Sequence, residues 1–172
     1  MNLLFRFLLT INATSWMIIL YLINEDFSIF NLPSWIFDIS LFLIPVLLSF
    51  LSIGLSKFLG KDNLSDCSEF NLADNEFLPV YLGYFFISIS IPCGDIKMLL
   101  IIYDIVFVFT FLSQAQYFNP IFLLFGYHYY HILTQNGTRI FVIHKGKVIR
   151  NKENLRFENL RRINDTTYIE KE

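Results

Sequence analysis

The basic residues of this sequence are distributed very unevenly along the chain. Nine of the thirteen Lys and Arg residues follow residue 126, and four precede it, in a stretch dominated by Phe, Leu and Ile. Residues 1–125 hold ten acidic and four basic side chains, and residues 126–172 hold five and nine, so the net charges are −6 and +4. Cytoplasmic segments of membrane proteins keep Lys and Arg, whereas translocated loops are depleted of them. The pattern therefore predicts a membrane domain (1–125) and a basic cytoplasmic tail (126–172).

Four apolar stretches in the first part are candidates for membrane-spanning helices. They cover residues 3–23, 36–58, 77–92 and 96–118, and about 20 apolar residues cross a hydrocarbon core of roughly 30 Å. This topology places Lys57 and Lys61 inside and Glu25 and Asp26 outside. We therefore expect an all-α membrane domain of four transmembrane helices, in a multi-pass protein with both termini in the cytoplasm.

The tail has the sequence pattern of short strands. Residues 127–133 and 139–144 flank Gln135-Asn136-Gly137, and Asn-Gly is a strong signal for a β-hairpin. Further strands are predicted at 147–150, 160–163 and 167–170, which gives a small antiparallel β tail domain or a partial barrel. A tail this short can form only a small hydrophobic core, and we therefore expect it to pack against neighbouring copies or against a partner.

Polar residues inside the apolar stretches are the main candidates for function. Asp104 lies near the middle of the fourth stretch, where an ionised carboxylate is costly. It is interpreted either as part of an ion or proton path, or trigger, or as an interhelical hydrogen-bonding residue that meets Asn12, Tyr103 or a serine of the second stretch. Asn12 is expected to face another helix, and Gln114 is a further candidate for interhelical bonding.

Small residues in the second stretch predict close helix packing. Ser49, Ser52 and Ser56 recur at steps of three and four residues, which places them on one helix face. A helix interface is favoured over a pore lining.

The sequence contains none of the familiar catalytic or cofactor-binding motifs. Its three histidines all lie in the tail, and His128 and His131 are three apart on a predicted strand, so their side chains point to opposite faces. No metal-type Cys or His spacing is present. We therefore expect a protein that is not an enzyme and has no cofactor and no metal site.

The basic tail residues have three interpretations. Arg150, Lys152, Arg156, Arg161 and Arg162 could reflect the positive-inside bias and attraction to anionic lipid headgroups. They could form a docking face for an acidic cytoplasmic partner. They could also contact nucleic acid, but a net charge of +4 without an interleaved aromatic motif is weak support for this, and no direct nucleic-acid binding is expected.

Three short segments carry a resemblance to a known family. Phe118-Asn119-Pro120, Phe125-Gly126-Tyr127 and a basic tail ending in Asp165-Thr-Thr-Tyr168-Ile-Glu170 follow four predicted spans. This layout resembles the small four-span membrane subunit of the bacterial Kiwa anti-phage system. The resemblance implies a non-enzymatic subunit of the bacterial inner membrane that assembles as a homo-oligomer, senses infection at the envelope and works with a cytoplasmic DNA-binding partner.

The leading hypothesis is thus a sensor or scaffold whose helices oligomerise in the bilayer and whose tail recruits a cytoplasmic effector. Two alternatives stay open. One is a small oligomeric ion channel or holin-like permeabiliser, with Asp104 and the serines lining the path. The other is an immunity protein against a membrane-active toxin.

Overall fold

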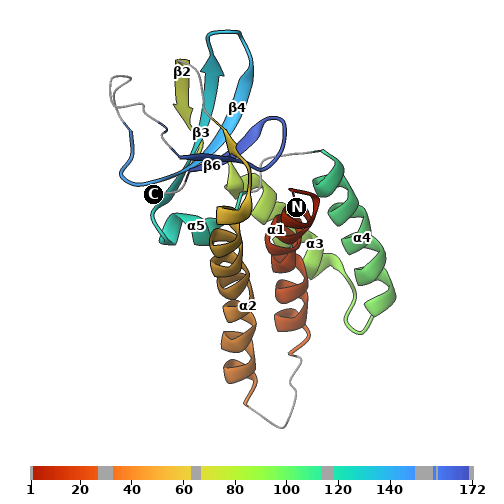
Figure 1. Ribbon diagram of the computed structural model, residues 1–172. Coiled ribbons are helices and arrows are strands. Elements are labelled where there is room, and N and C mark those ends of the chain that lie inside the picture. Colours follow the sequence, from red (N-terminus) through yellow and green to blue (C-terminus); the bar gives the residue numbers. More distant parts are fainter. Residues whose placement is uncertain are drawn as a thin grey trace.

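The helices of the protein form one end of the molecule, and a sheet covers the other (Figure 1). The computed structural model describes residues 2–26, 33–62, 67–113, 118–149, 157 and 159–170. The amino-terminal end of α1 lies on the side of the sheet, so the chain starts where its helical and sheet parts meet (Figure 1).

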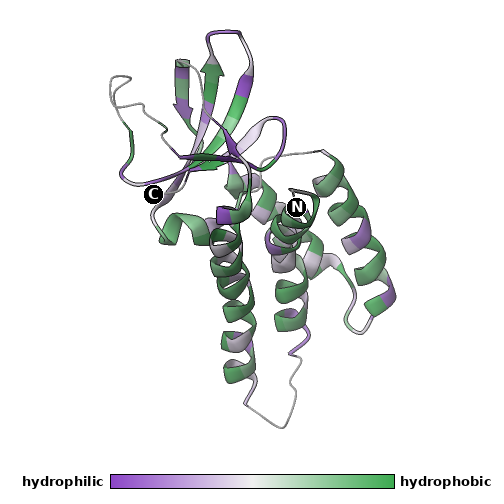
Figure 2. Cartoon of the chain, in the orientation of Figure 1, coloured by the Kyte–Doolittle hydropathy of each residue, from purple (hydrophilic) through white to green (hydrophobic). Residues whose placement is uncertain are grey.

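Among the described residues, two helices are long and apolar enough to cross a membrane. They are α1 (Asn2–Asn24) and α2 (Ser34–Leu55), which a short 3-10 helix, η1 (Ser56–Phe58), extends. At 1.5 Å per residue, α1 is about 34 Å long and α2 about 33 Å, which matches a hydrocarbon core of roughly 30 Å. Apolar residues run along both helices in Figure 2. Their length and composition support an association with a membrane.

The expected domain of four transmembrane helices is wrong. The other helices are α3 (Phe77–Ser90), α4 (Ile96–Leu112) and α5 (Pro120–Leu124). The lengths of α3 and α4 are about 21 and 26 Å, which is less than the thickness of the hydrocarbon core. Helix α3 ends at Ser90 because Ile91, the residue before Pro92, has an extended backbone (ψ 126°). Helix α4 ends at Leu112. The turn between them is closed by the Asp95 N–H, which donates to Pro92 O at 3.1 Å.

The sheet is larger than the predicted tail and is mixed rather than antiparallel. In the part of the chain that the structure describes, six strands stand in the order β1-β5-β6-β4-β3-β2, and β4 and β6 pair in parallel. The strands are β1 (Lys61–Asp62), β2 (Cys67–Leu72), β3 (Tyr127–Thr134), β4 (Arg139–Lys145), β5 (Leu160–Arg162) and β6 (Thr167–Glu170). Strands β1 and β2 come from the polar connection after α2, which was not predicted to contain strands.

The predicted hairpin is confirmed. Strands β3 and β4 pair antiparallel from Tyr127↔Lys145 to Leu133↔Arg139. Gly137 has a φ of 77° in the connecting turn, a conformation that costs glycine little. The strands predicted near 160–163 and 167–170 are also present, as β5 and β6. Residues 147–149 form no strand, and residue 150 lies outside the described residues.

Hydrophobic side chains cover both faces of the sheet. Along β3, Tyr127 and Tyr129 point into one core cluster, and Tyr130 and Ile132 point into another. The first cluster also contains Phe5 from α1 and residues of α5. The helices therefore pack onto one face of the sheet.

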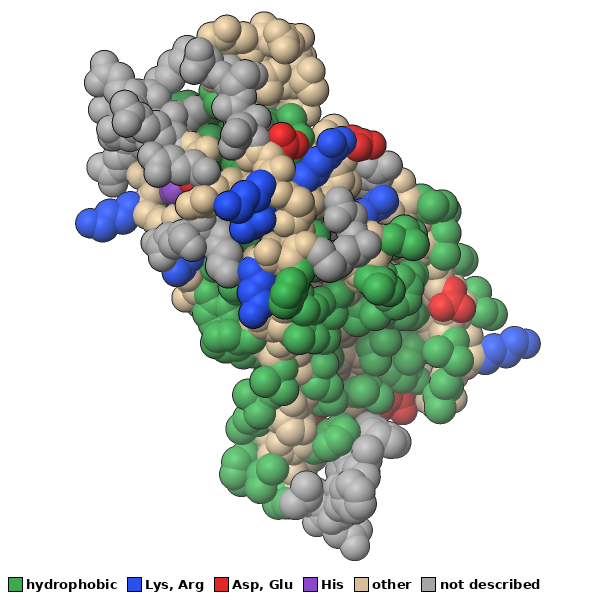
Figure 3. Space-filling model, in the orientation of Figure 1, with side chains coloured by type: hydrophobic (Ala, Val, Ile, Leu, Met, Phe, Trp, Pro, Cys, Tyr) green, Lys and Arg blue, Asp and Glu red, His purple; other side chains and the backbone are tan. Residues whose placement is uncertain are grey.

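Large hydrophobic side chains are exposed along the helices. Among the most exposed are Leu47 and Phe50 on α2, Phe86 on α3 and Phe109 on α4. On the face shown in Figure 3, apolar side chains cover most of the helical part. Such a surface fits a lipid environment or contacts between copies.

The buried position of Val142 in the sheet gives a test of this core. We expect Val142→Ala to lower the free energy of unfolding by roughly 2 kcal/mol, because its side chain is fully buried in β4 and truncation leaves a cavity. The matched variant Val148→Ala, at a residue that is 40% exposed, should change it by less than about 0.5 kcal/mol. Thermal unfolding of both purified variants in detergent measures the difference; equal losses would contradict this packing.

Candidate functional site at the junction of helices and sheet

A group of buried hydrogen bonds joins the helices at the sheet end. The Asn12 side chain of α1 donates from Nδ2 to Ser49 Oγ of α2 at 3.0 Å. The Asn119 side chain also donates to Ser49 Oγ, at 2.8 Å, and Ser49 Oγ donates to Pro45 O at 2.6 Å. All three side chains are almost completely buried, so one hydroxyl joins α1, α2 and the segment before α5. We call Asn12, Ser49, Asn119 and Tyr129 the junction cluster.

Asn119 has this position because of the local sequence. Its Oδ1 accepts from the Ile121 N–H at 2.9 Å and caps α5, and Pro120 occupies the first turn. Asn is a favoured N-cap and Pro a favoured first residue of a helix. Capping uses Oδ1 and leaves Nδ2 free to donate to Ser49. One side chain thus begins α5 and holds it against α2.

Tyr129 extends the junction cluster into the sheet. Its hydroxyl donates to Asn119 O and accepts from the Asn119 N–H, both at 2.9 Å. Burial raises the pKa of the Tyr129 phenol above its ordinary value of 10.0, so the hydroxyl that donates this bond stays protonated at alkaline pH as well as at neutral pH. Phe118 packs edge-on against the Tyr129 ring at 5.0 Å between centroids. The sheet is therefore bonded to the same point that joins α1 and α2.

Histidines and carboxylates fasten the start of α3 to β3. Asp74 accepts from the Tyr129 N–H and lies 2.7 Å from His128 Nδ1. Glu76 lies 2.9 Å from His131 Nε2. The third histidine, His144 on β4, pairs with Glu170 on β6. Each histidine thus has a carboxylate partner, and no cluster of three or more metal-binding side chains occurs among the described residues.

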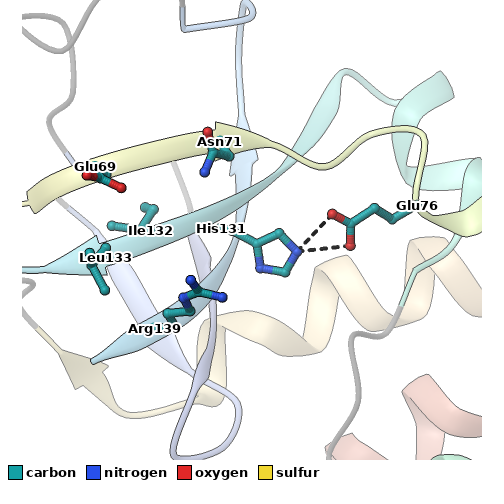
Figure 4. Close-up of a pocket in the computed structure, with 7 residues that line it drawn as sticks. All are labelled: Glu69, Asn71, Glu76, His131, Ile132, Leu133 and Arg139. Carbon is teal, nitrogen blue, oxygen red and sulfur yellow. Dashed lines mark hydrogen bonds and ion pairs between the residues drawn. The ribbon is translucent and has the colours of Figure 1, made fainter. Parts of the chain in front are cut away.

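A polar hollow of about 320 Å³ lies on the outer part of the sheet. Strand β2 contributes Glu69 and Asn71, β3 contributes His131, and β4 contributes Arg139, while Glu76 reaches it from just before α3 (Figure 4). The dashed lines in Figure 4 mark the bonds between His131 and Glu76. Side chains of both charges line the hollow, which suits a polar protein segment better than an apolar ligand.

No pattern in the sequence groups these lining residues. Glu69 and Glu76 lie in what reads as a polar connection, and Arg139 lies at the end of the hairpin turn, more than sixty positions away. The antiparallel pairing of β2 with β3, which sets Asn71 opposite His131, is what brings them together.

Comparison with known proteins assigns the chain to a family. A family model described as "Anti-phage protein KwaA" matches residues 5–169, which is nearly the whole chain. The chain belongs to the KwaA anti-phage family. No curated protein and no solved structure matches it. Membership of the KwaA family confirms the resemblance to the Kiwa system and gives the protein a role in anti-phage defence.

The residues predicted inside the membrane part have different surroundings in this KwaA-family chain. Asn12 lies in the junction cluster, whereas Asp104 is exposed on α4, beside the exposed side chains of Ile101 and Ile105. Tyr103, which was considered as a partner of Asp104, accepts instead from Thr14 Oγ1 at 3.2 Å. Gln114 lies outside the described residues.

The three serines predicted to pack helices are buried, Ser49 and Ser52 in α2 and Ser56 at the start of η1, and they bond mostly to backbone carbonyls of α2. Ser52 Oγ donates to Leu48 O and Ser56 Oγ to Ile53 O, each at 2.7 Å. Ser49 is the member of this group that also accepts bonds from Asn12 and Asn119. All three are at most 2% exposed, so within one copy their hydroxyls do not face a water-filled path.

Two of the five basic residues predicted to bind a partner are described, and both have contacts within the chain. Arg161 donates from Nη1 to Leu59 O at 3.0 Å and so ties β5 to the end of η1. Arg162 pairs with Asp165 at 2.5 Å, and this hydrogen bond raises the pKa of the guanidinium. Arg150, Lys152 and Arg156 lie outside the described residues.

The junction cluster predicts a large effect for one substitution. We expect Asn119→Ala to lower the free energy of unfolding by about 2 kcal/mol, because it removes the α5 cap and the bond to Ser49. The matched control Asn71→Ala changes an exposed amide on β2 and should have little effect. Thermal unfolding in detergent compares the two, and equal melting temperatures would show that the junction cluster contributes nothing.

The buried Tyr129 phenol makes the free energy of unfolding depend on pH in the alkaline range. Its pKa is raised by burial above 10.0 in the folded protein, so above pH 10 the unfolded chain releases a proton that the folded chain keeps. Stability is therefore complete below pH 10 and declines as the pH rises further. Unfolding free energies at about pH 8 and about pH 11 should show this decline, and it should be smaller in Tyr129→Phe. An identical decline in that variant would assign the effect to other groups.

Proposed function

We propose that the protein is a non-enzymatic sensor or scaffold subunit of an anti-phage complex in the bacterial inner membrane. In this proposal α1 and α2 cross the bilayer, copies oligomerise through their helices, and the sheet end recruits a cytoplasmic DNA-binding effector through its basic residues. KwaA family membership supports the defence role, and the two membrane-length helices support the location.

The observation that carries the proposal is the junction cluster. It bonds Asn12 of α1 and Ser49 of α2 to Tyr129 of β3 through Asn119. A displacement of α1 against α2 would leave buried polar groups without partners unless the sheet moved too, and such groups are costly to leave unpaired. This linkage suits a protein in which an event in the membrane changes a cytoplasmic surface.

The orientation in the proposal follows from charge. Lys57 and Lys61 follow α2, and the tail carries nine further basic residues, whereas the turn after α1 contains Glu25 and Asp26. With α1 and α2 in the bilayer, the positive-inside rule favours the sheet on the cytoplasmic side, and with it both termini.

Charge reversal in the tail tests recruitment in the full chain. We expect the triple variant Arg150→Glu, Lys152→Glu, Arg156→Glu to lower the amount of cytoplasmic effector that co-purifies from native membranes by at least about tenfold. These substitutions leave the strands intact, unlike a deletion of 127–172, which would remove four of the six strands.

Lys97→Glu is the matched control for this experiment. Lys97 is exposed in the first turn of α4, away from the sheet. The Lys97→Glu variant should co-purify as much effector as wild type does, and both this variant and the triple variant should stay in the membrane fraction. Undiminished capture by the triple variant would contradict recruitment through the tail.

A further inference from the structure

An apolar groove lies between the first turns of α1 and the last turns of α2. Its volume is about 390 Å³ and its lining is almost entirely apolar. The buried side chains of Phe5 and Leu59 form its floor, and the exposed side chains of Leu4, Leu51 and Phe58 form its rim. Ligand pockets in proteins commonly measure about 300–1,000 Å³ and are lined mainly by hydrophobic side chains. The groove is therefore large enough for part of an elongated apolar molecule.

Basic side chains lie at the sheet end of this groove. Lys57 Nζ is 4.9 Å from the ring centroid of Phe58 on the rim. Lys61 is exposed two positions after Leu59, and it lies opposite Arg161 in the pairing of β1 with β5. Arg161 Nη1 donates to Leu59 O. An apolar groove with cations at one end is chemically complementary to an anionic amphiphile, whose apolar part would lie in the groove and whose charged group would lie beside the cations.

Figure 3 shows how basic and apolar side chains are distributed on one face of the molecule. On that face, Lys and Arg side chains gather over the sheet part and along its border with the apolar helical surface. If α1 and α2 cross a bilayer, this border lies at the level of the lipid headgroups, because α1 begins there and α2 ends there (Figure 1). Acyl chains would then contact the groove from the side, and phosphates would lie beside the lysines.

We propose that this groove binds an acyl chain of an anionic membrane phospholipid whose phosphate is held by Lys57 and Lys61. Charge complementarity favours this occupant over a helix of a second copy, because an apolar helix face would leave the lysines without a partner at the mouth. The site depends on α1 and α2 lying in a membrane but not on recruitment of an effector.

Native mass spectrometry of the full-length protein tests the site. Delipidated protein in detergent is mixed with phosphatidylglycerol or with phosphatidylcholine of identical acyl chains, and bound lipids per chain are counted. We expect phosphatidylglycerol to bind more tightly than phosphatidylcholine. Lys57→Gln and Lys61→Gln should each weaken phosphatidylglycerol binding by about fivefold, and phosphatidylcholine binding should stay unchanged. Lys97→Gln, outside the groove, is the control.

Filling the groove gives a second and independent measurement. Leu8 lines the groove, so Leu8→Trp should reduce binding of both lipids, whereas Leu47→Trp on the exposed surface of α2 should not. The inference is overturned if wild type does not distinguish the two lipids or if Leu8→Trp binds phosphatidylglycerol as wild type does. It is also overturned if Leu8→Trp changes the oligomeric state alone, which would assign the groove to a second copy.

Discussion

The hydrogen bonds of Asn119 are the interactions on which the arrangement of this molecule depends. A buried amide is costly when its oxygen or its nitrogen has no hydrogen-bond partner, and the partners of the Asn119 amide lie on different elements. The oxygen caps α5 and the nitrogen bonds to Ser49 of α2, while the backbone of the same residue exchanges two bonds with Tyr129. Because one residue satisfies groups from α2, α5 and β3, their relative positions are fixed together.

Aromatic side chains around Asn119 also connect the helices to the sheet. Phe118 packs edge-on against both Tyr129 and Phe141, while the Tyr129 and Phe141 rings stack with 5.6 Å between centroids. Phe5 of α1 belongs to this core as well. The contact between helices and sheet is thus a continuous hydrophobic core with polar bonds at its centre, and it resembles the interior of one domain more than a contact between two.

Local features of the fold could be predicted from the sequence, whereas features that depend on pairing between distant segments could not. The Asn136-Gly137 turn specified the β3–β4 hairpin, and the apolar runs located α1 and α2. Strand β2 could not be recognised, because its polar, half-exposed residues read as a loop and it forms a strand by pairing with β3. The junction cluster combines Asn12 and Ser49, each noted for helix packing, with Asn119 and Tyr129, and no spacing in the sequence relates these four. For Asp104 the sequence left an ion path and an interhelical hydrogen bond both open, because its apolar neighbours do not reveal which side of the helix faces outward.

The strand order has a consequence for the order in which the molecule can form. Strand β6 follows the other five described strands in the sequence, yet it lies inside the sheet between β5 and β4, whereas the first two strands, β1 and β2, occupy its two edges. Helices α1 and α2 are therefore complete long before the sheet can close. Strand β6 must be in place before the two parts of the sheet that the structure describes, β1-β5 and β4-β3-β2, can join into one surface.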